Sequence, residues 1–394
     1  MCSYLVFVSN FSLNQRRQRM NAKKFIIGLL AEAGIEVNGP NPWDIQVYDE
    51  WFYDSVLAFG PLGLGESYMN GWWKCAELDE FFNRALCAQL DKKVRTFLQT
   101  ITLGPHVLWT RARDLGSRAN SHKIGEHHYG IGNDLYQAML DPYMAYTCGY
   151  WREAHDLNQA QKDKFDLVCL KMGLKRGMRV LDLGCGWGGF LKYAAEKYGI
   201  EGVGVTITEK QVELGSELCR GLPVQIKRMD YREVEGTFDR VVSIGLMEHV
   251  GPKHYRTFLQ KARSCVRGDG MFLLHTIGSH EKKMTVDPWT NKYIFPGGVI
   301  PSFEQVSEAV KGLFVIEDMH NFGHDYHPTL MAWHANFTVA WPRLKATGKY
   351  DERFRRMWEY YLLSCAGAFK ARRLQVWHFP LAPKGVKGGY KSIR

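Results

Sequence analysis

The sequence of 394 residues contains no apolar run long enough to cross a membrane as a helix. A spanning helix needs roughly 18 or more uninterrupted apolar residues, so we expect no transmembrane segment. The apolar start "MCSYLVFVSNF" precedes the basic cluster "RRQR", which reverses the order found in a secretory signal. We therefore expect residues 1–19 to be a disordered extension, with Met20 as an alternative natural start.

Cysteine is present without a recognisable pattern. The nine cysteines include no C-x-x-C pair, which argues against a disulfide framework and against a structural zinc site. We expect a reducing, cytoplasmic compartment and no metal ion.

Acidic residues are in deficit, with 41 Asp and Glu against 51 Lys and Arg, and the formal net charge is +10. This balance favours a polyanionic partner, either nucleic acid or an anionic lipid surface. The basic clusters at 16–24, 353–356 and 370–373 are equally typical of solvated helix faces. Aromatic residues make up 13% of the chain and suit a lipid–water boundary, an apolar substrate tunnel or a large core. Composition does not choose among these alternatives.

Apolar periodicity divides the chain into three parts and shows no internal repeat. Helical spacing predicts one amphipathic helix over 78–98. Together with "AKKFIIGLLAEAGI" and "YDSVLAFGPLGLGESYMNGWW", it predicts a small, mainly helical N-terminal domain over 20–103. The stretch 104–126, broken by Gly, Pro and Ser, predicts a linker.

From residue 127 to 394, strand and helix patterns alternate. Seven strands are predicted, at "MRVLDL", "VGVTIT", "VQIKRMD", "FDRVVSIG", "GMFLLHTIG", "LFVIEDMHNFG" and "LQVWHFPL". Such alternation is typical of an α/β domain with a doubly wound, mostly parallel sheet. Ligands bind such sheets at the carboxyl ends of the strands.

A glycine-rich stretch, "VLDLGCGWGG", follows the first predicted strand of this domain. Its spacing differs from the G-x-G-x-x-G of dinucleotide sites, and the second strand ends in Thr206, Ile207 and Thr208 rather than in an acid for a ribose. A nicotinamide cofactor is therefore disfavoured. Glycines that admit an amino-acid tail, followed by a helix whose N–H groups face a carboxylate, favour S-adenosylmethionine. Asp230, which closes the third strand, is placed to meet the adenine or simply to end the strand.

Longer segments carry a family resemblance. They are "LGLGESYMNGWW", "HHYGIGNDLYQAMLDPYMAYTCGYW", "GLMEHVGPKHY", "LLHTIGS", "DPWTNKYIFPGG", "NFGHDYHPTLMAWHANF" and "CAGAF". In this order, over about residues 20–378, the chain resembles the cyclopropane-fatty-acyl-phospholipid synthases. The resemblance implies a Rossmann-like methyltransferase sheet and transfer of a methylene from S-adenosylmethionine across a cis double bond of a phospholipid acyl chain, through a carbocation that is then deprotonated.

The resemblance also implies roles for individual residues. Donor-binding candidates are Tyr146, Thr147, Asp182, Gly184, Gly186, Gly188, Thr206, Ile207, Thr208, Gln211, Asp230, Tyr231 and Arg232. Candidates for a bound bicarbonate ion that acts as the base are Cys148, Glu248, His275, Ile277 and Tyr326. Cys365 is a further active-site candidate.

The residues by themselves leave several of these roles open. Glu248 is predicted to close the fourth strand and His275 to end the apolar run "MFLLH", which places both at the carboxyl edge of the sheet. The sequence does not say whether Glu248 or bicarbonate is the base. Cys148 and Cys365 are equally suited to apolar packing. Aromatic rings stabilise cations, and the candidates for this role are Tyr146, Tyr150, Trp151 and Tyr326.

Two rival functions are disfavoured. A nucleic-acid methyltransferase would need Asn or Asp before Pro-Pro and an aromatic residue, or a Pro-Cys nucleophile, and the sequence has neither at the expected place. A lipid-binding protein without activity is disfavoured because Glu248, His275 and Tyr326 are all present.

We therefore expect a homodimeric cytoplasmic enzyme that binds the inner face of the membrane peripherally and acts on unsaturated phospholipids. Aromatic residues of the first domain are candidates for the apolar contact with lipid or for packing within the protein. They are Trp72, Trp73, Phe81, Phe82 and Phe97.

Overall fold

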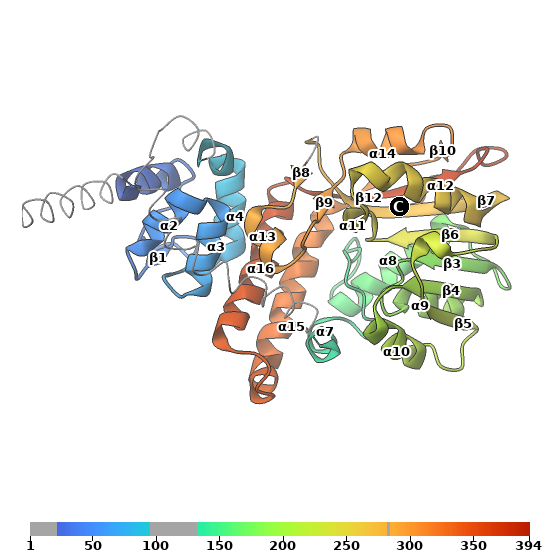
Figure 1. Ribbon diagram of the computed structural model, residues 1–394, viewed down its shortest axis with the longest axis horizontal. Helices are drawn as coiled ribbons and strands as arrows, with labels where there is room; N and C mark the ends of the chain where they lie inside the picture. Colours follow the sequence, from blue (N-terminus) through green and yellow to red (C-terminus); the bar gives the residue numbers. More distant parts are fainter. Residues whose placement is uncertain (1–21, 95–131, 282–283) are drawn as a thin grey trace, which may run out of the picture. The chain divides into compact units, whose positions relative to one another are not determined.

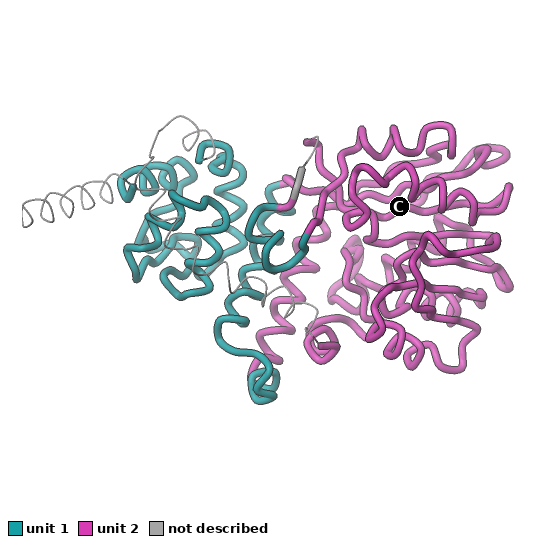
Figure 2. Tube along the Cα trace, in the orientation of Figure 1, with its two compact units in different colours: residues 1–131, 287–296, 343–371 teal, residues 132–286, 297–342, 372–394 magenta. Residues whose placement is uncertain are grey.

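The computed structural model of the chain describes residues 22–94, 132–281 and 284–394. The predicted extension over 1–19 and the predicted linker over 104–126 lie outside these residues. Two compact units are present (Figure 2). Unit 1 joins the N-terminal residues to segments 287–296 and 343–371, and unit 2 holds 132–286, 297–342 and 372–394. Two segments that follow the first strands of the sheet thus belong to the same unit as the N-terminal residues.

Unit 1 is mainly helical. Its elements are a helix over 22–31, β1 (Gln46–Val47), α2 (Trp51–Phe59), α3 (Pro61–Met69), β2 (Trp73–Lys74), α4 (Leu78–Cys87), α13 (Pro288–Tyr293) and α16 (Glu352–Lys370). Helices α16 and α4 pack closely where α16 carries Gly367, because a Cβ there would lie 2.5 Å from the carbonyl oxygen of Asp79. This close approach explains the glycine within "CAGAF".

The predicted helix over 78–98 is interrupted. Helix α4 ends at Cys87, and Gln89 has a φ of 55°, in the left-handed region, before helical residues resume at Leu90. A left-handed residue cannot continue a right-handed helix. The apolar spacing continues through this break. The sequence pattern therefore predicted one helix where the structure has two helical segments.

Two of the aromatic residues proposed for lipid contact, Trp73 and Phe81, form part of the core of unit 1, whereas Trp72 and Phe82 are half-buried. Trp73 is 0% exposed and Phe81 is 2% exposed, and their rings contact each other at a centroid distance of 5.4 Å. The buried guanidinium of Arg356 donates to the carbonyl oxygens of Tyr68 and Trp73. Trp73 and Phe81 therefore stabilise unit 1 and are not available to a membrane, and Phe97 lies outside the described residues.

Unit 2 is built on the predicted doubly wound sheet (Figure 1). Its strands lie in the order β10 (Val315–Ile316), β12 (Gln375–Ala382), β7 (Val266–Gly278), β6 (Phe238–Ile244), β3 (Arg179–Leu183), β4 (Glu201–Thr206) and β5 (Val224–Arg228), with β11 (His320–Asn321) also paired to β12. Strands β3 to β7 pair in parallel, and β12 pairs antiparallel with β7.

The sheet has eight strands instead of the predicted seven, because "LFVIEDMHNFG" forms the two short strands β10 and β11. Both pair with β12. Between them, Glu317 donates its N–H to Pro380 of β12 at 3.0 Å, and the proline has no N–H to donate back. The ladder is interrupted at this point, which a hydrophobicity pattern does not reveal.

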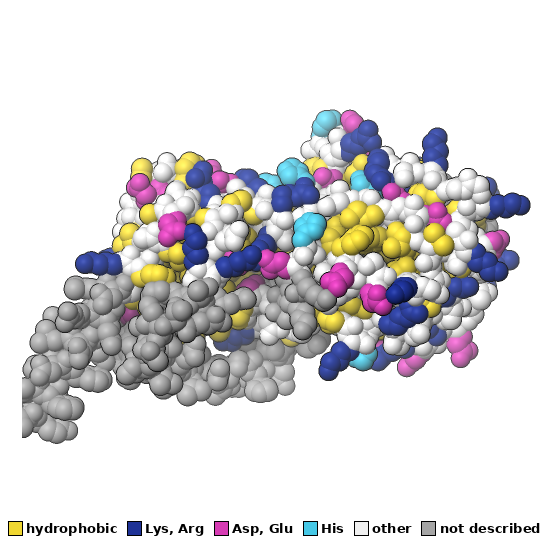
Figure 3. Space-filling view, turned by 90° about the horizontal axis from the view of Figure 1, so that it is seen from above, with side chains coloured by type: hydrophobic (Ala, Val, Ile, Leu, Met, Phe, Trp, Pro, Cys, Tyr) yellow, Lys and Arg dark blue, Asp and Glu magenta, His cyan; other side chains and the backbone are white. Residues whose placement is uncertain are grey.

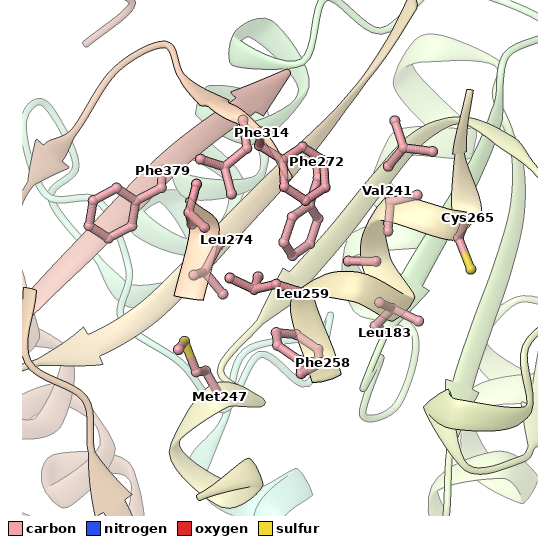
Figure 4. Packing of buried hydrophobic residues seen from close by; sticks show 14 of the residues in the cluster. Leu183, Val241, Met247, Phe258, Leu259, Cys265, Phe272, Leu274, Phe314 and Phe379 are labelled. Atoms are coloured by element: carbon pink, nitrogen blue, oxygen red, sulfur yellow. The ribbon is translucent and has the colours of Figure 1, made fainter. Parts of the chain in front are cut away.

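Helices cover both faces of the sheet. On one face lie α8 (Leu157–Lys171), α9 (Gly189–Tyr198) and α10 (Glu209–Leu218), and on the other α12 (Tyr255–Cys265) and α14 (Phe303–Val310). Phe258, Phe272 and Phe314 pack together under α12 and α14 (Figure 4). Each face therefore has its own apolar core.

The remaining elements of unit 2 are shorter or lie beside the sheet. They are α7 (Asn133–Met139), η1 (Tyr231–Glu233), α11 (Met247–Val250), η2 (Pro252–His254), β8 (Met284–Thr285), β9 (Val299–Ile300), η3 (Gly323–Asp325) and α15 (Tyr326–Ala346), whose last turn passes into unit 1. Among the described residues, no helix combines the length and apolar character needed to span a membrane.

The chain leaves β3 toward β4 and β5 on one side and returns to β6 on the other. Such a reversal of strand order opens a crevice at the carboxyl ends of the two central strands, which is where these sheets bind ligands. The glycine-rich stretch and Glu248 follow β3 and β6 directly.

Candidate active site

The glycine-rich stretch forms the turn between β3 and α9. Gly184, Gly186 and Gly188 all have a positive φ, and Gly184 N–H donates to the carbonyl oxygen of Val205 at 3.1 Å. A Cβ on Gly186 would meet no atom within 4 Å, whereas one on Gly189 would lie 2.0 Å from the carbonyl oxygen of Tyr143. Gly189 therefore allows close packing of this turn against the backbone of Tyr143. The space beside Gly186 is open to a ligand.

Thr147 is held in place by two buried side chains of α8. Gln161 Nε2 donates to its carbonyl oxygen and Lys164 Nζ to its Oγ1, both at 2.8 Å. Burial lowers the pKa of Lys164 to about 8. A Cβ on Gly245, just after β6, would lie 2.9 Å from Thr147 Cγ2. The predicted donor residue Thr147 thus lies against the end of a central strand.

Asp182 lies in β3 and is buried. Its Oδ1 has no hydrogen-bond partner among the described residues. Burial raises the pKa of Asp182 to about 7, against the opposing charge of Lys164. A buried acceptor without a partner is costly, and a cationic ligand group would satisfy it.

The other predicted donor residues line the ends of β4 and β5. Thr206 Oγ1 donates to Gln211 Oε1 at 2.6 Å, Ile207 is 71% exposed, and Thr208 precedes α10. Asp230 Oδ1 accepts from the backbone N–H of Arg232 at 2.9 Å, and its Oδ2 pairs with the Arg232 guanidinium at 2.6 Å.

The Asp230 carboxylate therefore caps η1 in this structure, and its predicted contact with the adenine stays a prediction. Tyr231, the next residue, packs its ring on Phe258 at a centroid distance of 5.4 Å.

Glu248 lies in α11, after β6, and not in the strand itself. Its Oε1 accepts the N–H of Ile277 at 2.5 Å, while Oε2 has no partner among the described residues. Burial, partly offset by the Ile277 hydrogen bond, raises the pKa of Glu248 to about 7. A carboxyl group with this pKa takes up or releases a proton near neutral pH.

His275 is level with the end of β6, paired with Ile244, and lies two residues before Ile277. Its Nδ1 is 2.8 Å from Nε2 of His378 in β12. Burial, together with the nearby Lys164 and Lys171, lowers the pKa of His275 well below its ordinary value. His275 is therefore a neutral imidazole beside the end of β6, the strand that precedes α11 and Glu248.

Tyr146 and Tyr326 belong to a continuous series of aromatic contacts in unit 2. Ring centroids are 5.0 Å apart for Trp187 and Tyr136, 5.1 Å for Tyr136 and Tyr146, 5.1 Å for Tyr146 and Trp333, and 5.9 Å for Trp333 and Tyr326. The series connects the glycine-rich turn with the start of α15, so a set of π faces extends through this part of the unit.

Tyr150 and Trp151 are outside this series. Tyr150 packs on His320 and Phe322, and Trp151 Nε1 donates to Thr329 Oγ1 at 2.8 Å. Cys148 is buried, which raises its thiol pKa well above the ordinary value, and the next residue, Gly149, donates its N–H to Thr329. Cys148 is therefore a neutral thiol, and the hydrogen bond of the neighbouring Gly149 holds this part of the chain against the first turns of α15.

Cys365 lies in α16, in unit 1. Burial raises its thiol pKa to about 12, so it is protonated at neutral pH. Its predicted part in the active site stays a prediction.

Four residues of this region were not singled out from the sequence: Lys164, Trp187, Trp333 and His378. Trp333 follows Tyr326 by seven positions, two helical turns, so a helix beginning at Tyr326 would have placed them on one face. His378 had no comparable signal, because its pairing with His275 depends on the register between β12 and β7.

Known proteins are similar to this chain over most of its length. The family model described as mycolic acid cyclopropane synthetase matches residues 117–379. The cyclopropane-fatty-acyl-phospholipid synthase of Escherichia coli (strain K12) is 47% identical over 93% of this chain and 94% of that protein. The chain belongs to the cyclopropane synthase family.

Solved structures agree with this assignment. The cyclopropane synthase MmaA2 from Mycobacterium tuberculosis is 29% identical with a TM-score of 0.60, covering 66% of this chain and 97% of that one. The mycolic acid cyclopropane synthase CmaA1 complexed with SAH and CTAB is 30% identical with a TM-score of 0.60, covering 64% and 95%.

Coclaurine N-methyltransferase, at 20% identity and a TM-score of 0.63 over 81% of this chain and 98% of that one, shares the fold. The predicted family, methyltransferase fold and enzyme class are thereby confirmed. The chain is an S-adenosylmethionine-dependent enzyme of lipid acyl-chain cyclopropanation.

The residues of the glycine-rich turn fit this donor. A Cβ on Gly186 would meet no atom within 4 Å, so the space beside this glycine is open to a ligand group. Asp182 Oδ1 is a buried acceptor without a partner among the described residues, which suits the donor's positively charged ammonium group.

Proposed function

We propose that this chain acts on cis-unsaturated acyl chains of membrane phospholipids, and that Glu248 organises the loss of the proton that closes the ring. The observation that carries the proposal is the buried Glu248 carboxyl group at the carboxyl edge of the sheet. An alkene has no proton to remove before it attacks a methyl group, but the cation that it becomes must lose one. The reaction therefore needs one base and protection from water.

Donor binding is assigned to the turn after β3 and to the ends of β4 and β5. When bound, S-adenosylmethionine supplies an electrophilic methyl group. The assigned residues are Tyr146, Thr147, Asp182, Gly184, Gly186, Gly188, Thr206, Ile207, Thr208, Gln211, Asp230, Tyr231 and Arg232. Lys164 and Gln161 support them indirectly, because both hold Thr147 in position.

Aromatic rings hold the cation on the acyl chain. The rings of Tyr146 and Tyr326 both pack against Trp333, and such π faces attract positive charge without acting as nucleophiles. Their apolar edges also exclude water, which would otherwise convert the cation to an alcohol.

Glu248 takes up the proton in the simplest form of the proposal. Its Oε2 has no partner among the described residues, and the N–H of Ile277 orients the carboxyl group through Oε1. A pKa of about 7 leaves a substantial fraction ionised at neutral pH, so the group can act in each turnover.

A bound bicarbonate ion is the alternative base, held by Cys148, Glu248, His275, Ile277 and Tyr326. The raised pKa of Glu248 favours this version in one respect, since a protonated carboxyl group donates to an anion instead of repelling it. The Ile277 N–H already donates to Glu248, which leaves fewer donors for the ion. Bicarbonate would supply a proton acceptor at this place.

Purified protein incubated with S-adenosylmethionine and vesicles of cis-unsaturated phospholipid should yield acyl chains heavier by one CH2. Mass spectrometry of the released fatty acids measures the product. Vesicles of saturated phospholipid are the matched control and should give no product, because they offer no double bond. Methylation of RNA in the absence of any lipid product would contradict the proposal and favour the nucleic-acid alternative.

Membrane association is proposed to be peripheral, electrostatic and on the cytoplasmic side. Lys and Arg side chains are distributed over the face shown in Figure 3, with Asp and Glu side chains between them, and the chain carries a net charge of +10. Each basic side chain near an anionic leaflet contributes about 1 kcal/mol.

Binding of the full chain to vesicles should therefore strengthen as anionic lipid is added and weaken as salt is raised, because salt screens exposed charges. Sedimentation with vesicles of graded anionic content measures both effects. Binding that is independent of lipid charge and salt would contradict an electrostatic attachment. A homodimer stays a prediction, for which light scattering of the purified protein is the measurement.

A further inference from the structure

Unit 2 buries three histidines and a lysine in a group that we call the basic chain: His275, His378, His320 and Lys171. His275 Nδ1 lies 2.8 Å from His378 Nε2, and His320 Nδ1 lies 3.0 Å from Lys171 Nζ. His320 is the strand partner of His378, and their ring centroids are 6.4 Å apart. The basic chain therefore begins at a predicted active-site residue and continues across β12 and β11 to the end of α8.

Lys171, at the outer end of the basic chain, is 1% exposed, and an exposed arginine acts on its charge. Lys171 interacts electrostatically with Arg394 and Asp318, which form an ion pair whose arginine is exposed. Tyr390 OH donates to the carbonyl oxygen of Lys171 at 3.2 Å. The basic chain thus connects the neighbourhood of Glu248 with the protein surface.

The histidines of the basic chain are neutral. Burial, together with neighbouring bases, lowers the pKa of His378 well below its ordinary value and that of His320 to about 3. Burial and the charge of Arg394 lower the pKa of Lys171 to about 7, against the opposing charge of Asp318. The other charged groups that act on the basic chain are Lys164, on His275 and His378, and Arg152, on His320.

The ring nitrogens are ordered for proton transfer. A neutral imidazole carries one proton, so it donates from one nitrogen and accepts at the other. When His275 donates from Nδ1, His378 accepts at Nε2 and carries its own proton on Nδ1. His378 Nδ1 is buried and has no partner among the described residues, so it is available to pass that proton onward.

One aromatic ring packs against all three imidazoles of the basic chain. Phe322 contacts all three imidazoles, with centroid distances of 5.8 Å to His275, 4.7 Å to His378 and 5.3 Å to His320. Tyr150 packs against both Phe322 and His320. A site that must exclude water to protect a cation cannot release its proton through open solvent. It needs a path for the proton made of protein side chains.

We propose that the basic chain carries the proton released by ring closure from the base at Glu248 to solvent, an inference that rests on the proposed function. A C–H bond of the transferred methyl group breaks, its electron pair forms the last ring bond, and the proton goes to the base. The base passes it to Nε2 of His275, which releases its Nδ1 proton to His378 Nε2. His378 releases its Nδ1 proton to Nε2 of His320 through one bridging water. His320 releases its Nδ1 proton to the neutral amine of Lys171, and the ammonium group so formed loses a proton to solvent.

The test compares the first turnover with steady-state turnover on unsaturated vesicles. In His378→Gln, the amide keeps a hydrogen-bond partner for His275 but cannot take up a proton. We expect first-turnover ring formation within about twofold of wild type, because Glu248 can hold one proton. Steady-state turnover should fall roughly tenfold or more, because that proton then leaves slowly. The control is His280→Gln, the same change at an exposed histidine, which should show no such burst.

Lys171→Met removes the last base while filling the same space, and it should show the same burst. Thermal unfolding and S-adenosylmethionine binding show whether each variant is folded. If His378→Gln does not fold, Lys171→Met tests the relay in its place.

Equal first-turnover and steady-state rates in the variants would overturn the relay. So would full activity in His378→Gln together with loss in His378→Leu, because His378 would then only position His275. A wild-type protein that forms no ring on any lipid would instead refute the proposed function, so the two failures are distinguishable.

Discussion

Replacing Glu248 with glutamine is expected to lower the rate of ring formation by about 100-fold or more, the loss typical of a removed acid–base group. Glutamine keeps the shape of the side chain, and its Oε1 can still accept the N–H of Ile277. What it loses is the ability to take up a proton at Oε2, or to organise an ion that does so. Mass spectrometry of the acyl chains after a fixed time measures the rate.

S-adenosylmethionine binding should survive in Glu248→Gln, because Glu248 is not among the residues assigned to the donor. Calorimetric titration with the donor checks this separation. Glu235→Gln, the same substitution at an exposed position between η1 and β6, is the matched control and should retain the wild-type rate. Wild-type turnover in Glu248→Gln would refute any role of this carboxyl group in proton removal.

The pH dependence of the wild-type enzyme distinguishes the two versions of the base. When Glu248 itself accepts the proton, it must be ionised. Because burial raises its pKa to about 7, the rate should rise as the pH increases through about 7. When a bicarbonate ion accepts the proton, the protonated carboxyl group is the favourable neighbour, and this rise is lost. Restoration of activity by added bicarbonate in Tyr326→Phe would also favour the bound ion.

Much of unit 2 could be predicted because its signals are local. The glycine-rich turn, the parallel strands around it and the order of Thr206 and Asp230 along the sheet edge follow from short stretches of sequence. Glu248 and His275 could be placed at the same edge because parallel strands end together. The residues that surround Glu248 and His275 could be identified only from the folded structure.

The features that the sequence did not predict depend on distant partners or on single backbone angles. The break at Gln89 rests on one left-handed residue within a continuous apolar pattern. The division of "LFVIEDMHNFG" arises from Pro380, more than fifty positions later along the chain. His378 reaches His275 through strand register. Local pattern therefore identified the elements, while tertiary pairing determined which side chains meet.

Changing Gly186 to valine is expected to weaken S-adenosylmethionine binding by about 100-fold or more, equivalent to roughly 3 kcal/mol. A Cβ at Gly186 meets no protein atom within 4 Å, so the new side chain would occupy the space assigned to the donor's tail without a clash inside the protein. Gly186 has a φ of 55°, so the variant also pays a backbone strain of about 1–2 kcal/mol.

Gly221→Val separates this strain from the effect on the donor. Gly221 has a φ of 83° and is likewise open to a Cβ, but it lies in the turn between α10 and β5 and is not among the residues assigned to the donor. Both variants should lose similar stability in thermal unfolding, because both place a branched residue in the left-handed region. Only Gly186→Val should lose donor affinity in calorimetric titration. Unchanged affinity in a folded Gly186→Val protein would mean that the donor does not lie against this turn.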